Sequence, residues 1–223
     1  LMSPADPGAS LNASLQKFID NRGEGLFALM LEAPDPDAEA DELLCRGLAV
    51  LPLMPGAAGR DVHPRSTHGV LIRVYPTPTA AAPPPPAELV TGITRVTIAV
   101  RDFDHAVTVY RDQLAMALEE LPPDATRGVR AAHCRPGSGG VIELVSPFDE
   151  TRPFASRIAR FLAEREGMFE IVLESDDLTA LEARLNTHGV ALRTPADAAS
   201  AREVGAESAF GVTIRLEQRV AVG

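Results

Sequence analysis

The side chains best suited to bind a metal or to move a proton are the five histidines, and their positions differ in kind. His63 and His68 flank the loop sequence Pro-Arg-Ser-Thr, where a histidine pair more often faces solvent or caps a turn than binds metal. His105 and His188 fall within or at the end of helical patterns, which favours a structural role. His133 lies on an alternating strand and could face either side of a sheet. These histidines alone therefore predict no metal centre.

Other motifs that carry chemistry are absent. The chain has no GxSxG, no P-loop, no GxGxxG that opens a helix after a strand, and no HExxH. The glycine-rich segment 137–140 lies between two predicted strands, so we expect a hairpin turn rather than a phosphate cradle. Cys45 and Cys134 fall in a helix pattern and a strand pattern without CxxC spacing, so we expect buried thiols and no disulfide.

Composition excludes several classes of protein. The 223 residues are 45% apolar, enough to build the core of one large or two small domains. No apolar run approaches membrane-spanning length and no charged-then-apolar signal begins the chain, so we expect a cytoplasmic protein without a membrane partner. The formal net charge of −10 and the scarcity of aromatic residues argue against a nucleic-acid partner.

The elements that would position polar side chains are clearest between Ile93 and Met116. Arg95–Val100 alternates and is rich in β-branched residues, which predicts a strand. Asp102 or Asp104 can cap the helical pattern that follows. The predicted elements of this part of the chain are a helix over 103–115 and strands over 93–100, 117–121, 128–134 and 140–146.

The chain repeats itself. SLQKFIDNRGEGLFALMLEAPD from Ser14 matches RIARFLAEREGMFEIVLESDD from Arg157, and Gly69–Arg73 matches Gly211–Arg215. A repeat in fixed order predicts duplicated supersecondary units. The further predicted helices are 9–22, 37–46, 152–166 and 177–187, and the further predicted strands are 26–33, 48–53, 60–63, 69–75, 168–175, 189–194, 201–206 and 210–217.

A Pro-rich linker over 77–91, containing AAAPPPP, divides the chain and is expected to be stiff polyproline II. Residues 1–76 are predicted to hold a connecting helix and one module. Residues 92–223 are predicted to hold two paired modules, 92–147 and 148–219.

Two stretches carry a resemblance to a known family. VRDFDHAVTVYRDQLAM from Val100 and GVIELVSP from Gly140 resemble a βαβββ module of the vicinal oxygen chelate (VOC), or glyoxalase-like, superfamily. RGEGLFALMLE from Arg22 and HPRSTHGVLIRVYP from His63 are similar to the second module of methylmalonyl-CoA epimerase. The resemblance implies an α+β fold of repeated βαβββ modules, with curved mixed sheets and helices outside.

The resemblance also implies that modules work in pairs, each supplying half of a curved sheet. The module in residues 1–76 therefore lacks its partner. Leu1–Pro4 matches Leu144–Pro147, the end of the module in 92–147, and looks like the tail of a further module, whose body we expect upstream.

The superfamily normally holds a divalent metal with two histidines on the first strands and two carboxylates or glutamines on the fourth strands. The resemblance places at these four positions Arg95, Glu143, Glu170 and Arg215. In the amino-terminal module the corresponding residues are Ala28 and Arg73, neither of which can ligate. Two arginines among four positions would repel a divalent cation, so we expect the metal site to be lost and no cofactor to be bound.

Two interpretations of these four charges stay open. They could form a neutral salt-bridge cluster at the old metal position, or the arginines could bind an anionic ligand. Glu119 and Glu120 lie close to the catalytic glutamate of the epimerases and could move a proton, or they are two solvated acids. The candidate ligand-binding residues are Arg95, Glu143, Glu170, Arg215, His63 and His68, the last two because this loop lies near the substrate mouth in the resembling family.

The resemblance implies a VOC protein that acts on or binds a small anionic or thioester metabolite. If it is an enzyme, we expect a lyase or isomerase of the glyoxalase or CoA-epimerase type. The alternatives are a metal-free ligand-binding protein, comparable to the bleomycin-resistance class, and a non-catalytic scaffold. We expect the unpartnered module to pair with an upstream module or with a second chain, as a homodimer.

Overall fold

The computed structural model describes residues 2–4, 10–54, 58–78, 89–137 and 139–220. The chain forms two compact units, Leu1–Ala81 and Ala82–Gly223, which are described separately. Their boundary falls in the Pro-rich linker expected over 77–91, and residues 79–88 of this linker lie outside the described residues, so its polyproline II conformation stays an expectation. No helix of the described residues is long and apolar enough to cross a membrane.

The first unit is a helix followed by one module with a three-stranded sheet of order β1-β3-β2. Its elements are α1 Ser10–Arg22, β1 Leu29–Ala33, α2 Pro36–Cys45, β2 Arg60–Val62, the 3₁₀ turn η1 Pro64–Ser66 and β3 Ile72–Pro76. The strand expected over 48–53 is reduced to one bridge between Val50 and Val62. Pro52, which has no N–H to donate, limits this ladder.

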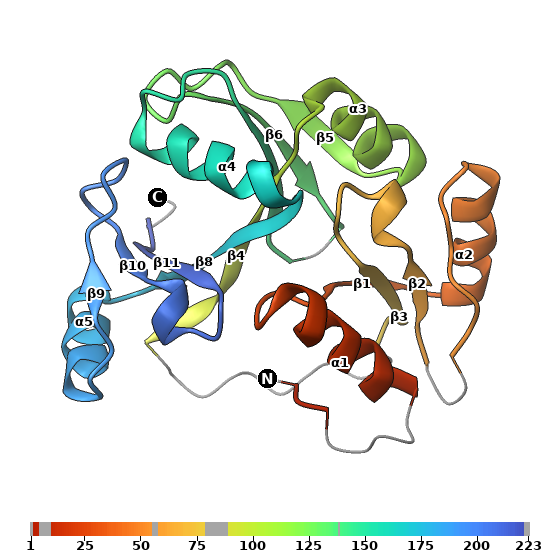
Figure 1. The fold of residues 1–223 in the computed structure, drawn as a ribbon, viewed down its shortest axis with the longest axis horizontal. Helices are drawn as coiled ribbons and strands as arrows, with labels where there is room; N and C mark the ends of the chain where they lie inside the picture. Colours follow the sequence, from red (N-terminus) through yellow and green to blue (C-terminus); the bar gives the residue numbers. More distant parts are fainter. Residues whose placement is uncertain (1, 5–9, 55–57, 79–88, 138, 221–223) are drawn as a thin grey trace. The chain divides into compact units, whose positions relative to one another are not determined.

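The second unit contains one eight-stranded mixed sheet of order β5-β6-β7-β4-β8-β11-β10-β9 (Figure 1). Its first half is β4 Val90–Ala99, α3 Phe103–Thr108, the π-helical turn η2 Val109–Gln113, β5 Ala117–Glu120, β6 Val129–Arg135 and β7 Val141–Pro147. Its second half is α4 Pro153–Glu164, β8 Gly167–Ser175, α5 Leu178–Thr187, β9 Leu192–Arg193, β10 Arg202–Val204, the 3₁₀ turn η3 Ala206–Ser208 and β11 Thr213–Gln218. The α+β architecture of βαβββ modules is as expected.

Each half of this sheet has the same strand order, and the halves join at their first strands. β4 pairs with β7 and β8 with β11 in parallel, while β4 and β8 pair with each other antiparallel. The residues that β4 and β8 carry on one face therefore lie at the centre of the sheet.

The helix expected over 103–115 begins as predicted and then changes. Of the two candidate caps, Asp102 accepts a hydrogen bond from the backbone N–H of His105 at 3.0 Å. The α-helix ends at Thr108 and continues as a π-helical turn, in which the N–H of Leu114 donates to the carbonyl of Val109. The β-branched run of residues 107–109 has low helix propensity, which is compatible with the change.

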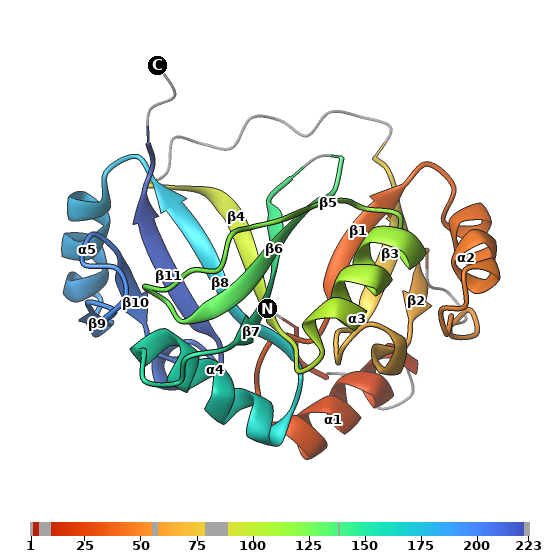
Figure 2. The ribbon, with the colours of Figure 1, turned by 90° about the horizontal axis from the view of Figure 1, so that it is seen from above.

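The connecting helix α4 packs on one end of the sheet face that carries Arg95, Thr97 and Glu143, which we call the site face. The packed residues are Ala99, Val129, Ala131 and Val145 of the sheet and Phe154, Ala155, Ile158 and Leu162 of α4. Apolar residues of α5 pack with residues of β8 and β11 in a separate cluster (Figure 2). α4 thus leaves the middle of the site face to polar side chains.

Phe154 is the central residue of this packing, because it is fully buried and makes an edge contact with Phe169 at 6.0 Å between ring centroids. Replacing Phe154 with Ala is expected to lower the free energy of unfolding of the second unit by about 3–5 kcal/mol. Hydrogen exchange of peptides from β4, β7 and α4 measures this loss.

The matched control is Phe148→Ala, because Phe148 is 51% exposed. Its effect should stay within about 0.5 kcal/mol. Equal losses for the two variants would contradict the packing of α4 described above.

Candidate functional site

The four positions singled out from the sequence come together on the site face, one from each of β7, β4, β8 and β11. The Nε atom of Arg95 lies 3.6 Å from Oε2 of Glu143, and the Nε atom of Arg215 lies 3.4 Å from Oε1 of Glu170. The ion pairing of the first interpretation is therefore present, with one pair in each half of the sheet. Whether these residues bind a ligand remains a prediction.

In the first half, the carboxylate of Glu143 is surrounded by donors and is only 2% exposed. Arg127 donates from Nη2 and Nη1 to its two oxygens at 2.8 and 3.3 Å, and the hydroxyl of Thr97 donates at 3.1 Å. His133, whose Nε2 lies 3.5 Å away, also faces this carboxylate. Burial alone would raise the pKa of Glu143, but the hydrogen bonds from His133 and Arg127 hold it well below its usual value. This half therefore holds a fixed, ionised carboxylate.

Arg127, the main partner of Glu143, was missed in the sequence. The carboxylate of Asp124 positions it, accepting from the backbone N–H groups of Thr126 and Arg127 and from Nε of Arg127, each at 2.9 Å. Burial would lower the pKa of Arg127, but Glu143 and Asp124 keep it above its usual value. An aspartate that accepts hydrogen bonds from backbone N–H groups two and three residues later is typical of a turn. This turn pattern could have drawn attention to Asp124 in the sequence.

In the second half, the pair of Glu170 and Arg215 is buried but incompletely hydrogen-bonded. The two residues are 1% and 3% exposed. Nη1 of Arg215 donates to Oδ2 of Asp197 at 2.8 Å. Nε and Nη2 of Arg215 and Oε2 of Glu170 have no hydrogen-bond partner. Buried polar groups are normally paired, so these atoms need an explanation.

These atoms are concentrated at one place. Five buried side-chain nitrogen and oxygen atoms lack a partner in the part of the chain that the structure describes. One belongs to Arg60, and the other four belong to Arg95, Glu170 and Arg215. Arg95 also donates to Oε1 of Glu217 at 3.1 Å, which ties β4 to β11 across β8.

The protonation of Glu170 is balanced near neutral pH. Burial raises the pKa of Glu170 to about 7, against the opposing charges of Arg215, Arg157 and Arg95. Glu203 adds to the rise. Both the neutral and the ionised forms of Glu170 are therefore populated around pH 7.

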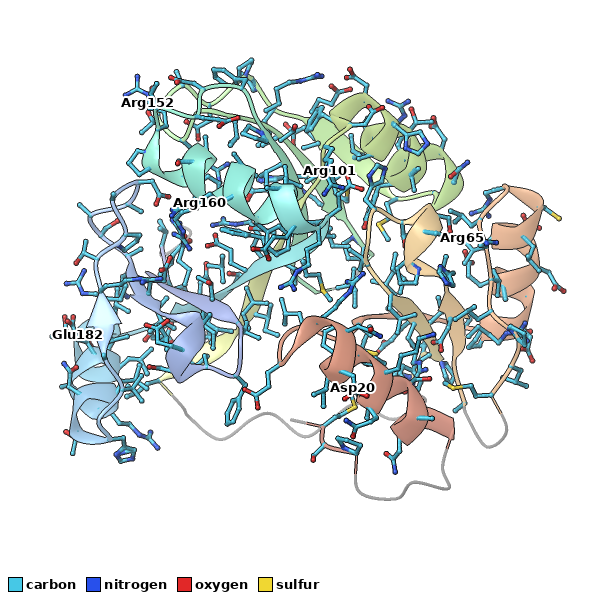
Figure 3. The ribbon with its side chains drawn as sticks, in the orientation of Figure 1. Asp20, Arg65, Arg101, Arg152, Arg160 and Glu182 are labelled. Atoms are coloured by element: carbon cyan, nitrogen blue, oxygen red, sulfur yellow. The ribbon has the colours of Figure 1, made fainter. Side chains whose placement is uncertain are left out.

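A third buried carboxylate, that of Glu203 on β10, lies opposite Arg215 in register and was also missed. It accepts from Nη1 of Arg157 at 2.8 Å and from Nε of Arg193 at 2.6 Å. Arg157 extends from α4, whereas Arg160 on the same helix, labelled in Figure 3, is exposed. Strand register places Glu203 opposite Arg215, so this position could have been found from the predicted strands.

The two candidate proton-transfer residues lie on opposite faces of β5. Glu119 pairs in register with His133 and therefore shares the site face at the edge of the sheet. Glu120 pairs in register with Ala132, and its carboxylate lies 4.0 Å from Arg130. The structure thus brings Glu119, and not Glu120, to the face that carries Glu143.

The loop histidines belong to the first unit, Leu1–Ala81. Nδ1 of His63 accepts from the backbone N–H of Arg65 at 3.0 Å, so of the two expected roles, facing solvent or capping a turn, His63 has the capping role. His68 is buried with a left-handed backbone, at φ 52°. Arg73 forms a two-bond ion pair with Asp61, and this hydrogen bonding raises the pKa of Arg73. A role of His63 or His68 in ligand binding remains a prediction.

The remaining expectations have mixed outcomes. Segment 137–140 joins the antiparallel strands β6 and β7, as a hairpin turn should, although residue 138 lies outside the described residues. Cys134 is buried, and burial raises the pKa of its thiol to about 12. Cys45 is exposed, so the expectation that it is buried was wrong. It lies at the end of α2, where Leu43 rather than Cys45 faces the core.

The arrangement of β4–β7 and β8–β11, with two βαβββ modules sharing one sheet, defines a VOC-type protein. A family model described as "Glyoxalase-like domain" matches residues 95–219, more than half of the chain and all four site positions. The chain therefore belongs to the glyoxalase-like domain family. No curated protein matches the chain.

Several solved structures are similar. Methylmalonyl-CoA epimerase from Mycobacterium tuberculosis is 31% identical over 61% of this chain and 93% of its own, with a TM-score of 0.50. A hypothetical protein from Bacillus halodurans is 23% identical over 59% of this chain and 96% of its own, with a TM-score of 0.50. The second likeness concerns the fold alone.

The fixed carboxylate of Glu143 leads to a prediction about stability. Glu143→Gln should lower the free energy of unfolding at pH 7 by ~3 kcal/mol, because Arg127 and Arg95 lose a buried counter-charge. The folded-state pKa of Glu143 is depressed, so its contribution is present at neutral pH and is lost as the pH falls below about 4. The loss is progressive down to the depressed pKa of the folded state, so urea unfolding of both proteins should show a smaller difference at pH 3 than at pH 7.

Glu217→Gln is the control, since Glu217 also pairs with Arg95 but has a side chain that is 33% exposed. Its effect should stay below about 1 kcal/mol. An equal loss in both variants, or a loss for Glu143→Gln that is as large at pH 3 as at pH 7, would refute the assignment of a buried, ionised Glu143.

Proposed function

We propose that this protein binds a small carboxylate in the second half of its site, without a divalent metal. The observation that carries the proposal is the set of buried atoms without hydrogen-bond partners, Nε and Nη2 of Arg215 and Oε2 of Glu170. Such atoms lose the hydrogen bonds of water on folding, and a polar ligand would restore them.

The geometry of arginine makes a carboxylate the best match. Nε and Nη2 form one edge of the guanidinium, and two parallel N–H groups on one edge suit a carboxylate in bidentate pairing. The remaining nitrogen of Arg215, Nη1, is held by Asp197 at 2.8 Å. The free edge is thus fixed in orientation before a ligand arrives.

The residues at the family's metal positions do not fit a divalent cation. Arg95 and Arg215 carry no lone pair to donate and repel positive charge. The carboxylate of Glu143 is already bonded by Arg127 and Thr97. Among the described residues, no group of three or more His, Cys, Asp or Glu side chains could hold a metal ion. We therefore propose no chemistry that proceeds through a metal.

The similarity to methylmalonyl-CoA epimerase extends the proposed ligand class to the thioester of a small acid. If the protein is an enzyme, a lyase or isomerase reaction is proposed, with Glu119, which shares the site face, as the candidate for proton transfer. In the first half of the site, the carboxylate of Glu143 already has hydrogen-bond donors from Arg127 and Thr97. This favours a second function, in which the salt bridges act as a scaffold that fixes the sheet without a ligand. A cytoplasmic location stays a proposal.

We also propose that the first unit completes its sheet with another module, either upstream or in a second copy of the chain. In the second unit the first strands of both modules, β4 and β8, pair with each other. The corresponding strand of the first unit, β1, pairs with β3. For the 223-residue chain alone, size-exclusion light scattering is therefore expected to report a dimer. A monomer would contradict pairing through a second copy.

Carboxylate binding is tested by titration calorimetry at pH 6.5 with acetate, propionate, lactate, malonate and succinate. The wild type is expected to bind at least one of them. Arg215→Gln should weaken that binding at least tenfold, or about 1.4 kcal/mol, because it removes the bidentate donor edge. Arg219→Gln is the control, since Arg219 has an exposed side chain that pairs with Asp176 at 3.2 Å.

A second variant keeps the proposal testable if Arg215→Gln fails to fold. Asp197→Asn removes the negative charge held by Nη1 of Arg215 and should strengthen binding of the same carboxylate. If no carboxylate binds to the wild type, or if Arg219→Gln weakens binding as much as Arg215→Gln, the proposal is wrong.

A further inference from the structure

We infer that a carboxylate bound at Arg215 is taken up together with one proton, which is held by Glu170. This inference rests on the proposed function and deepens it, because it assigns a specificity-determining role to Glu170. A protonated glutamic acid donates one hydrogen bond and an ionised glutamate only accepts. The state of Glu170 therefore decides whether the site accepts an anion.

The position of Glu170 makes contact with such a ligand unavoidable. Its Oε1 lies 3.4 Å from Nε of Arg215, and its Oε2 is buried without a partner. A carboxylate on the free edge of Arg215 would then lie beside Glu170, while Asp197 occupies Nη1. Three carboxylates would surround one guanidinium, and like charges this close disfavour ionisation of one of them.

The other charged groups around Glu170 are already matched. Arg157 from α4 is held by Glu203 of β10, and Arg95 from β4 by Glu143 and Glu217. The ion pairs around the site form three separate groups among the described residues: Arg95 and Arg127 with Asp124, Glu143 and Glu217; Arg157 and Arg193 with Glu203; and Arg215 with Glu170 and Asp197. In the last group two carboxyl groups already face one guanidinium, so an added anion finds no spare positive charge there.

Protonation of Glu170 resolves this conflict and adds a bond. The neutral acid can donate from Oε2 to an oxygen of the bound carboxylate, a strong O–H···O⁻ hydrogen bond. Burial already raises the pKa of Glu170 to about 7 in the free protein, and a neighbouring anion raises it further. Binding should therefore be tightest below pH 7 and should weaken as the pH rises from 7 toward the pKa of the bound state.

An amide analogue of the same ligand should behave in the opposite way. Its carbonyl oxygen can accept from Arg215, and its NH₂ group can donate to ionised Glu170. Affinity for propionamide should accordingly hold constant or rise with pH, while affinity for propionate falls by about tenfold per pH unit above pH 7.

The experiment is titration calorimetry of the full chain with propionate and propionamide from pH 6 to 9, in buffers of different ionisation enthalpy. At pH 8 the wild type should take up close to one proton per propionate bound. Glu170→Gln, whose amide donates at every pH, should bind propionate with no proton uptake and no pH dependence. Glu174→Gln on the same strand should behave as the wild type does.

The outcomes separate this inference from the proposed function. If propionate and the other carboxylates fail to bind the wild type at any pH, both ideas are wrong. If propionate binds with no proton uptake at pH 8, or if Glu170→Gln keeps the pH dependence of the wild type, only the role of Glu170 is wrong. If the affinities for propionate and propionamide fall in parallel as the pH rises, the role of Glu170 is also wrong.

Discussion

The antiparallel pairing of β4 with β8 is the interaction on which the rest of the second unit depends. It joins two four-stranded halves edge to edge and places Thr97 opposite Glu170 at the centre of the sheet. The ladder is interrupted by register shifts between Ile93 and Arg95 and between Thr97 and Ile98. Such irregularities bend a strand and redirect its side chains, and here they occur where Arg95 and Glu170 face the site.

On the last two strands of each of the three modules, one pair of facing residues occupies the same position, and its residue types differ between the modules. The last two strands of each module bring together Asp61 with Arg73, His133 with Glu143, and Glu203 with Arg215 in register. In the first unit the acid and the arginine bond each other directly. In the last module, Arg157 and Arg193 hold Glu203 instead, so Arg215 is left to Asp197 and to a partly bonded Glu170. The bonding of Arg215 is thus incomplete because its strand neighbour, Glu203, is bound by Arg157 of α4 and Arg193 of β9.

Most of the fold could be predicted, because hydrophobic alternation and the internal repeat both depend on local sequence. The site could be predicted only where its residues lie on strands. Arg127 and Asp197 come from loops and Arg157 from a helix, and their reach depends on tertiary packing that no local pattern encodes. The shortening of the strand expected at 48–53 shows the same limit, since Pro52 stops a ladder that the apolar pattern alone would extend.

The ring of Phe154 connects the two charged halves without belonging to either hydrogen-bond network. The guanidinium of Arg127 stands 5.0 Å from its centroid and that of Arg215 stands 5.6 Å from it. Both cations share one aromatic quadrupole, so a displacement of one changes the field and the packing space of the other. The halves should therefore be thermodynamically coupled: in a double-mutant cycle, changes at Arg127 and Arg215 would not add, although no hydrogen bond joins the two residues.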